Sequence, residues 1–276
     1  MAMAIRNILF HAFEGDAGKA LEDVAFSLAA DHGATLTALS VVDNTPIPSY
    51  VVPYVPANLA ETYIDESRAA AKAIESRVRA HADSTGVATE WRYREGDIRA
   101  VFTQHSHYTD LVLLAQGSGS DIPVGPALNL PGDLVLTAGR PVTVIPWKGA
   151  RTPIGRRVLI GWNGSTEATR ALNDAMPILE RADAVKILTV GEPETRHLPG
   201  AEIAQHLARH GVKAEADHAV ESDSSSSEIL MFEAKEYEAD LLVCGAWGHS
   251  RMFETVLGGV TRDLLRSMEL PLLMSH

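Results

Sequence analysis

The sequence predicts an α/β protein built from two copies of one folding unit, each with a parallel sheet flanked by helices. Short apolar segments alternate with amphipathic ones along the 276 residues, which is the pattern of βαβ units. Similar segments also recur at fixed distances. Ile8 and Val158 begin ILF and VLI, 150 residues apart, and Asp110 and Asp240 begin DLVLLA and DLLVCG, 130 residues apart. One proline-rich insertion in the first copy explains the change of offset.

The first copy, assigned to residues 1–150, is expected to contain five strands and four helices. Its strands are expected at 8–12, 34–43, 88–95, 111–115 and 141–146. A helix before Gly33, one over 59–85, one capped by Asp97 and a short one near 134–138 lie between them. Four prolines exclude regular structure over 44–58.

The second copy, assigned to residues 151–276, repeats this plan after a polar connector. Strands are expected at 157–161, 185–190, 212–219, 241–244 and 271–274. One helix opens at Ser165 and Glu167, two span 201–209 and 228–239, and the last begins near Val260. In such sheets the ligand site lies at the carboxyl ends of the strands.

Composition narrows the class of partner. Apolar residues make up 46% of the chain, the net charge is −12, and Lys and Arg form no run. This balance argues against nucleic acid and against an anionic membrane surface. No segment approaches 18 consecutive apolar residues, and Cys244 is the only cysteine, so no internal disulfide can form. We expect a cytoplasmic protein in which Cys244 packs in a buried strand.

The stretch 240–276 carries the candidate ligand site. Glycine lets backbone N–H groups approach a ligand closely, and four glycines lie between the last two strands: Gly245, Gly248, Gly258 and Gly259. The residues Val260, Leu264, Leu265 and Met268 form one apolar helix face. The last two glycines therefore lie at a helix N-terminus, which favours a phosphate. A plain turn without a ligand is the alternative, and neither a P-loop nor a dinucleotide motif is present.

The pattern Gly245-x2-Gly248-x9-Gly258 resembles the nucleotide loop of the universal stress protein family, G-x2-G-x9-G-[ST]. Gly259 stands where the motif has Ser or Thr, so one hydroxyl donor is absent while the backbone N–H remains. The resemblance covers nearly the whole chain as two copies. It implies two tandem Rossmann-like open sheets of five parallel strands, each in the order 3-2-1-4-5.

The resemblance also implies an adenine-nucleotide site in the second copy, with ATP, and Mg²⁺ beside it, as the expected cofactors. Asn163 stands where the family has an Asp that contacts the nucleoside, and Val190 matches a residue of the adenine pocket. The implied binding residues are Gly161, Trp162, Asn163, Val190, Cys244, Gly245, Trp247, Gly248, His249, Gly258, Gly259, Val260 and Thr261.

The first copy departs from this pattern. Ala115 and Ser118 fall where Gly245 and Gly248 fall in the second copy. Phe13 stands at the position of Asn163, and residues 128 and 129 are Leu and Asn in place of two glycines. We therefore expect the first copy to keep the fold without the phosphate-binding glycines, and the chain to bind at most one nucleotide.

The sequence gives little evidence for a metal site or a catalytic site. His206 and His210 lie four residues apart on a helix, but no third metal ligand is evident, so a surface pair is expected. No nucleophile-elbow motif occurs and no general base is placed for water, so at most weak ATP hydrolysis is expected. The leading function is a stress-response sensor or regulator that binds ATP. The alternatives are a protein-interaction module without nucleotide and, third, a nucleotide-using transferase.

The fifth strands and the family resemblance also predict how the two copies interact. The fifth strands, at 141–146 and 271–276, would each be an exposed apolar edge, and such edges invite pairing. In the family, separate subunits commonly pair through this strand, so the resemblance implies that the two copies pair within one chain. A homodimer of whole chains and an unidentified protein partner complete the expected interactions.

Overall fold

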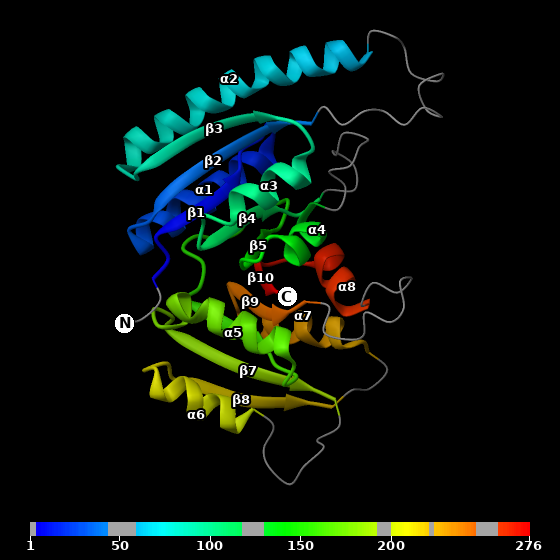
Figure 1. Cartoon of the computed structure of the whole chain (residues 1–276). Coiled ribbons are helices and arrows are strands. Elements are labelled where there is room, and N and C mark those ends of the chain that lie inside the picture. The colour runs from blue at the N-terminus through cyan, green and yellow to red at the C-terminus, as the bar shows by residue number, and fades with distance from the viewer. Residues whose placement is uncertain (1–3, 44–58, 118–129, 192–199, 221–223, 247–258) are drawn as a thin grey trace.

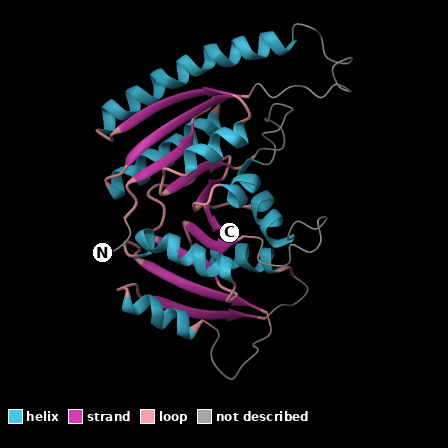
Figure 2. Ribbon diagram, in the orientation of Figure 1, coloured by secondary structure: helices cyan, strands magenta, loops and turns pink. Residues whose placement is uncertain are grey.

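The computed structural model describes residues 4–43, 59–117, 130–191, 200–220, 224–246 and 259–276. Its strands form one ten-stranded sheet in the order β3-β2-β1-β4-β5-β10-β9-β6-β7-β8 (Figures 1 and 2). Each half has the order 3-2-1-4-5, and all neighbours within a half are parallel. The predicted fold class is confirmed, with the refinement that the two sheets are continuous.

The predicted elements of the first half are all present. Its strands are β1 (Asn7–His11), β2 (Thr35–Val42), β3 (Thr89–Glu95), β4 (Leu111–Ala115) and β5 (Val142–Ile145). Its helices are α1 (Asp16–His32), α2 (Leu59–Thr85), α3 (Ile98–Ser106) and α4 (Leu130–Thr137). Asp97 caps α3 as predicted, because its side chain accepts a hydrogen bond from the Ala100 N–H at 2.8 Å. Helix α4 begins earlier than predicted.

The second half repeats this order. Its strands are β6 (Arg157–Gly161), β7 (Ala184–Val190), β8 (Ala214–Ala219), β9 (Leu241–Gly245) and β10 (Leu272–Ser275). Its helices are α5 (Thr166–Leu179), α6 (Ala201–Arg209), α7 (Ser226–Glu236) and α8 (Gly259–Ser267). Helix α7 begins two residues before the predicted start, because Ser225 and Glu228 form a reciprocal capping box.

Two aspartates hold equivalent places in the halves. Asp110, just before β4, accepts hydrogen bonds from the backbone N–H groups of Arg6 and Asn7 at the start of β1. Asp240, just before β9, accepts from the N–H groups of residues 155–157 at the start of β6. Each carboxylate thus joins the first and fourth strands of its half, which gives the sequence repeat a structural basis.

The sheet carries one helical layer on each face. One buried cluster joins α1, α2, α5 and α6 to the sheet, and the other joins α3, α4, α7 and α8. Both clusters contain residues of both halves, so the two halves share their cores. Within the described part of the chain, no helix is long and apolar enough to cross a membrane.

The halves meet through their fifth strands. Strands β5 and β10 are antiparallel, with Val144 opposite Leu272 and Thr143 opposite Leu273. Both Val144 and Leu272 have no exposed surface. The prediction that the fifth strands pair within one chain is therefore confirmed. The connector between β5 and β6 contains residue 150, where the boundary between the halves was predicted.

Candidate functional site

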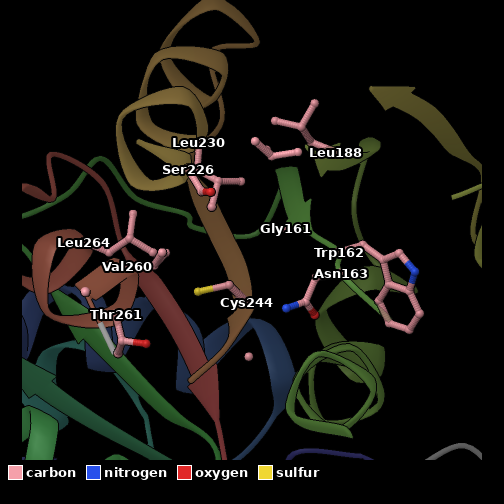
Figure 3. Close-up of a pocket in the computed structure, with 13 residues that line it drawn as sticks. Gly161, Trp162, Asn163, Leu188, Ser226, Leu230, Cys244, Val260, Thr261 and Leu264 are labelled. Carbon is pink, nitrogen blue, oxygen red and sulfur yellow. The ribbon is translucent and has the colours of Figure 1, made fainter. Parts of the chain in front are cut away.

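A cleft of about 420 Å³ opens at the carboxyl ends of β6, β7 and β9, beside the N-termini of α7 and α8 (Figure 3). Strand β6 lies between β7 and β9 in the sheet and ends at Gly161. The cleft therefore spans the end of β6, which is where an open parallel sheet binds its ligands.

The structure brings together every predicted site residue that it describes. These residues line the cleft from three strand ends and one helix start: Gly161, Trp162, Asn163, Val190, Cys244, Gly245, Gly259, Val260 and Thr261. The other predicted residues, Trp247, Gly248, His249 and Gly258, lie outside the described residues.

Gly161 is needed to keep the cleft open. A Cβ atom at this position would lie 3.1 Å from Leu230 Cδ2 and 3.6 Å from Cys244 Cβ. Gly245 has a packing reason of its own, because a Cβ there would collide with the backbone where Glu167 and Ala168 begin α5. The two glycines thus differ: one leaves room in the cleft, and the other lets β9 approach α5.

Asn163 presents a hydrogen-bond donor to the cleft. Its Oδ1 accepts a hydrogen bond from the Ser165 N–H at 3.1 Å, within the turn that starts α5. Ser165 Oγ in turn accepts from the Ala168 N–H and caps the helix. Because Oδ1 is already engaged, the amide nitrogen is the group that Asn163 directs toward the cleft (Figure 3).

Val190 contributes backbone groups at the end of β7. The register of β6 with β7 ends at the pair Gly161–Leu188, and the Trp162 N–H donates to the Leu188 carbonyl. Along a strand, the backbone N–H and C=O groups of successive residues point alternately to the two neighbouring strands. The Gly191 N–H points to β8, because it donates to the Ala219 carbonyl. The N–H and C=O of Val190 therefore point to the β6 side, beyond the last pair of that register.

The start of α8 forms the other wall. Gly259 and Val260 begin the helix, and first-turn N–H groups have no partner within a helix. Among the described residues, the atom nearest to a Cβ at Gly259 would be Asp263 Oδ2, 3.8 Å away. The predicted helix face was wrong at Val260, which is 41% exposed, while Thr261 is buried in its place. The inward face is thus set by Thr261, Leu264 and Met268, three and four residues apart.

The described residues that line the cleft carry no formal charge. Among the described residues that line it, the polar side chains are those of Trp162, Asn163, Ser226 and Thr261. Cys244 is also uncharged at neutral pH, because burial raises the pKa of its thiol to about 12. This thiol is therefore a packing group and not a nucleophile, as the sequence predicted.

Four lining residues were not predicted: Leu188, Ser226, Leu230 and Leu264. Leu264 was assigned to the inner face of its helix, and Leu188 lies two residues before Val190 on the same side of β7. Ser226 and Leu230 come from α7, whose start was placed two residues too late. The capping pattern of Ser225 with Glu228 is the signal that identifies this helix start.

The corresponding corner of the first half is filled by aromatic rings. His11 ends β1 where Gly161 ends β6. Its ring lies 4.8 Å from that of Phe13 and 5.1 Å from that of Phe102, which is fully buried on α3. Burial lowers the pKa of His11 to about 4, so the imidazole is neutral at pH 7.

The histidine pair at the end of α6 is not part of a larger metal-ligand group among the described residues. The rings of His206 and His210 lie 4.9 Å apart. Within the described ranges, no three His, Cys, Asp or Glu side chains are grouped so as to hold a metal ion.

The fold is that of a duplicated α/β protein, with a cleft at the strand ends of its second half. Residues 155–276 match the universal stress protein family, so the second half of the chain belongs to that family. The recognition made from the glycine pattern is confirmed. No curated protein matches the sequence.

Two solved structures extend the likeness of fold to the whole chain. A universal stress protein from Archaeoglobus fulgidus has a TM-score of 0.76 at 15% identity, with 98% of this chain and 97% of that chain covered. A Pseudomonas aeruginosa protein assigned to the universal stress proteins has a TM-score of 0.63 at 16% identity, with 99% and 93% covered. Both halves therefore share the universal stress protein fold in tandem.

Proposed function

We propose that the cleft of the second half binds ATP and that the protein is a stress-response sensor or regulator. The observation that carries this proposal is that two backbone sites line one cleft, whose described lining is uncharged: the strand end at Val190 and the helix start at Gly259. The first suits a nucleobase and the second a phosphate.

The base would lie at the end of β7. The N–H and C=O of Val190 form a neighbouring donor and acceptor, which complement the acceptor ring nitrogen and donor amino group on one edge of adenine. Leu188 and Leu230 supply apolar surface on this side of the cleft. Such a combination of apolar walls and a few fixed polar groups is typical of small-molecule sites.

The phosphates would lie at the start of α8. The first-turn N–H groups and the positive end of the helix dipole attract an anion. Within the described residues, no carboxylate lines the cleft, so none opposes a phosphate there. The Asn163 amide nitrogen adds a donor just after the end of β6 (Figure 3).

Mg²⁺ would enter with the nucleotide. Magnesium prefers several oxygen ligands, often carboxylates together with phosphates and water. The described lining contains no carboxylate, so the described residues do not form a magnesium site of their own. Phosphate oxygens and water would supply most of the coordination.

We expect binding without efficient hydrolysis. Attack by water needs a general base within hydrogen-bond reach. Among the described lining residues there is no His, Asp or Glu, and the Cys244 thiol is neutral and buried. A protein partner that responds to the bound nucleotide would then carry the regulatory output.

Mass spectrometry of the small molecules released from the purified chain, followed by titration calorimetry with Mg·ATP, tests the proposal. We expect released adenine nucleotide or, from an empty preparation, saturable binding of one ATP per chain. If a folded chain neither carries an adenine nucleotide nor binds ATP at millimolar concentration, the nucleotide function is wrong. The interaction-module alternative would then stand.

A further inference from the structure

Gln116 connects the first half of the chain to the helix that borders the cleft. It follows β4 and is 8% exposed. Its side-chain Nε2 donates to the carbonyl oxygens of Leu265 and Arg266 in the second half, at 2.9 and 3.2 Å. Its Oε1 accepts from the Trp147 N–H at 3.3 Å. The amide is therefore hydrogen-bonded at both ends, across the junction of the halves.

The carbonyls that Gln116 contacts lie in the last turn of α8. The last four carbonyls of a helix have no partner within it, and a side-chain donor can satisfy them. Helix α8 has nine residues, and its buried residues are Thr261 and Leu264. Its first turn lines the cleft. Gln116 thus holds the end of α8 opposite to the one that faces the ligand site.

This contact runs in one direction only between the described residues. Ala246 follows β9 as Gln116 follows β4, and both donate their backbone N–H to the neighbouring fifth strand: Gln116 to Ile145 and Ala246 to Ser275. Ala246 has no side-chain amide, so it offers no corresponding donor to α4. The first half therefore donates the side-chain hydrogen bond across the junction, and helix α8 of the second half, which borders the cleft, accepts it.

We propose that Gln116 is a positioning residue for the ligand site of the second half. By capping the last turn of α8, it fixes the position of the first-turn N–H groups at the phosphate end of the cleft. The first half then contributes to ligand binding although its own corner is filled by His11. This inference rests on the proposed nucleotide function, because it assigns the start of α8 to the phosphates.

The variants Gln116→Leu and Gln116→Met remove the amide at similar size. Thr143→Val is the matched control, because Thr143 is 1% exposed in the same junction and its hydroxyl has no hydrogen-bond partner in the described part of the chain. Hydrogen exchange of the α8 amides in the ligand-free chain reports whether the helix is held. Calorimetry with ATP and with adenosine separates the phosphate end of the site from the base end.

Both Gln116 variants are expected to exchange faster in α8 and to bind ATP about three- to tenfold more weakly, the loss expected for about one hydrogen bond. Adenosine affinity should change less than about twofold, because adenosine has no phosphate to meet the first turn of α8. Thr143→Val should leave the exchange and both affinities unchanged. Thermal unfolding shows whether each variant is folded. If one Gln116 variant is not folded, the other one is used to test the proposal.

If the Gln116 variants exchanged the α8 amides as slowly as wild type, or bound ATP and adenosine equally more weakly, the positioning role would be wrong. The proposed nucleotide function would not be affected by either result. A wild-type chain that binds neither compound would overturn the nucleotide function, and the ligand part of this inference with it. Since exchange is measured without ligand, the two failures are distinguishable.

Discussion

His11 and Gly161 hold equivalent positions, each at the last paired residue of the first strand in its half. His11 pairs with Leu39 of β2, and Gly161 pairs with Leu188 of β7. The imidazole of His11 packs on aromatic rings, whereas the missing side chain at Gly161 leaves space beside Leu230. The two halves thus share a backbone plan here and differ in the side chain at the end of the first strand.

The variant Gly161→His would place at the end of β6 the residue type that ends β1 in the first half. The imidazole would enter the cleft, since even a Cβ there lies 3.1 Å from Leu230. We expect at least about a hundredfold loss of ATP affinity, the scale of losing two or more hydrogen bonds and apolar contacts. Calorimetry measures the loss, and Gly161→Ala, which only displaces the flexible end of Leu230, should lose much less. Tight binding by a folded Gly161→His chain would place the ligand elsewhere.

Stoichiometry tests the difference between the halves directly. Only the second half combines an open strand end with a glycine at the helix start, so wild type should bind one ATP per chain. Calorimetry on a chain of known active concentration measures this number. Two equivalent sites per chain would contradict the role assigned to His11.

The variant Gly259→Ser would restore the hydroxyl that the family motif has at this position. The described surroundings leave space for it, because their nearest atom to a Cβ at this position would lie 3.8 Å away. If phosphate lies at the start of α8, the added donor should strengthen ATP binding by about three- to tenfold, the net value of one ordinary hydrogen bond. Gly259→Ala is the control, since it adds the same carbon without the hydroxyl. Equal ATP affinities of the two variants would show that the phosphates do not lie at this position.

Acid should weaken the fold through His11. Its folded pKa of about 4 lies below the ordinary histidine value of 6.5, so the unfolded chain binds more protons between these values. The contribution of His11 to stability is therefore fully present above pH 6.5 and is lost as the pH drops toward 4, by about 3 kcal/mol. The pKa of His32 is also lowered to about 4, first by burial and then by Arg181, so it acts in the same window.

Urea unfolding at pH 7.5 and at pH 5 measures this loss. His11→Phe keeps a ring beside Phe13 and Phe102 but cannot titrate, so its unfolding free energy should depend less steeply on pH than that of wild type. Carboxylates and His32 titrate alike in both proteins and cancel in the comparison. Parallel pH dependences of the two proteins would show that His11 is not kept neutral by burial.

Much of the fold could be predicted because the signals were local or repeated. Hydrophobic runs bounded by glycine, proline or capping residues placed every strand, and the spacing of Asp110 and Asp240 marked the same joint in both halves. The errors also had local causes. Val260 is apolar and in helical register, but it lies over a cleft, so its exposure depends on what the neighbouring elements leave uncovered.

The cleft was predicted less completely because it depends on distant contacts. The strand-end rule and the family resemblance gave the backbone positions around Gly161, Val190 and Gly259. Leu230 was missed because only the packing of α7 beside Gly161 brings it to the site. Gln116 was missed for a stronger reason: its partners in α8 lie about 150 residues away, and no local pattern marks an amide that crosses a domain junction.

The variant Val144→Lys tests whether the two halves are one cooperative unit. Val144 is fully buried on β5 opposite Leu272 of β10, so a lysine there would bury its charge or open the junction. We expect a loss of about 3–5 kcal/mol, shared by both halves because the sheet and both cores are continuous.

Leu136→Lys on α4 is the matched control for this last test, because Leu136 is already 42% exposed and should tolerate the same change within about 0.5 kcal/mol. Hydrogen exchange in β9, which lies in the second half and does not contact Val144 in the strand register, reports whether destabilisation crosses the junction. Solution scattering measures whether the halves separate. If Val144→Lys left both the β9 exchange and the dimensions of the chain as in wild type, the junction would not couple the two halves.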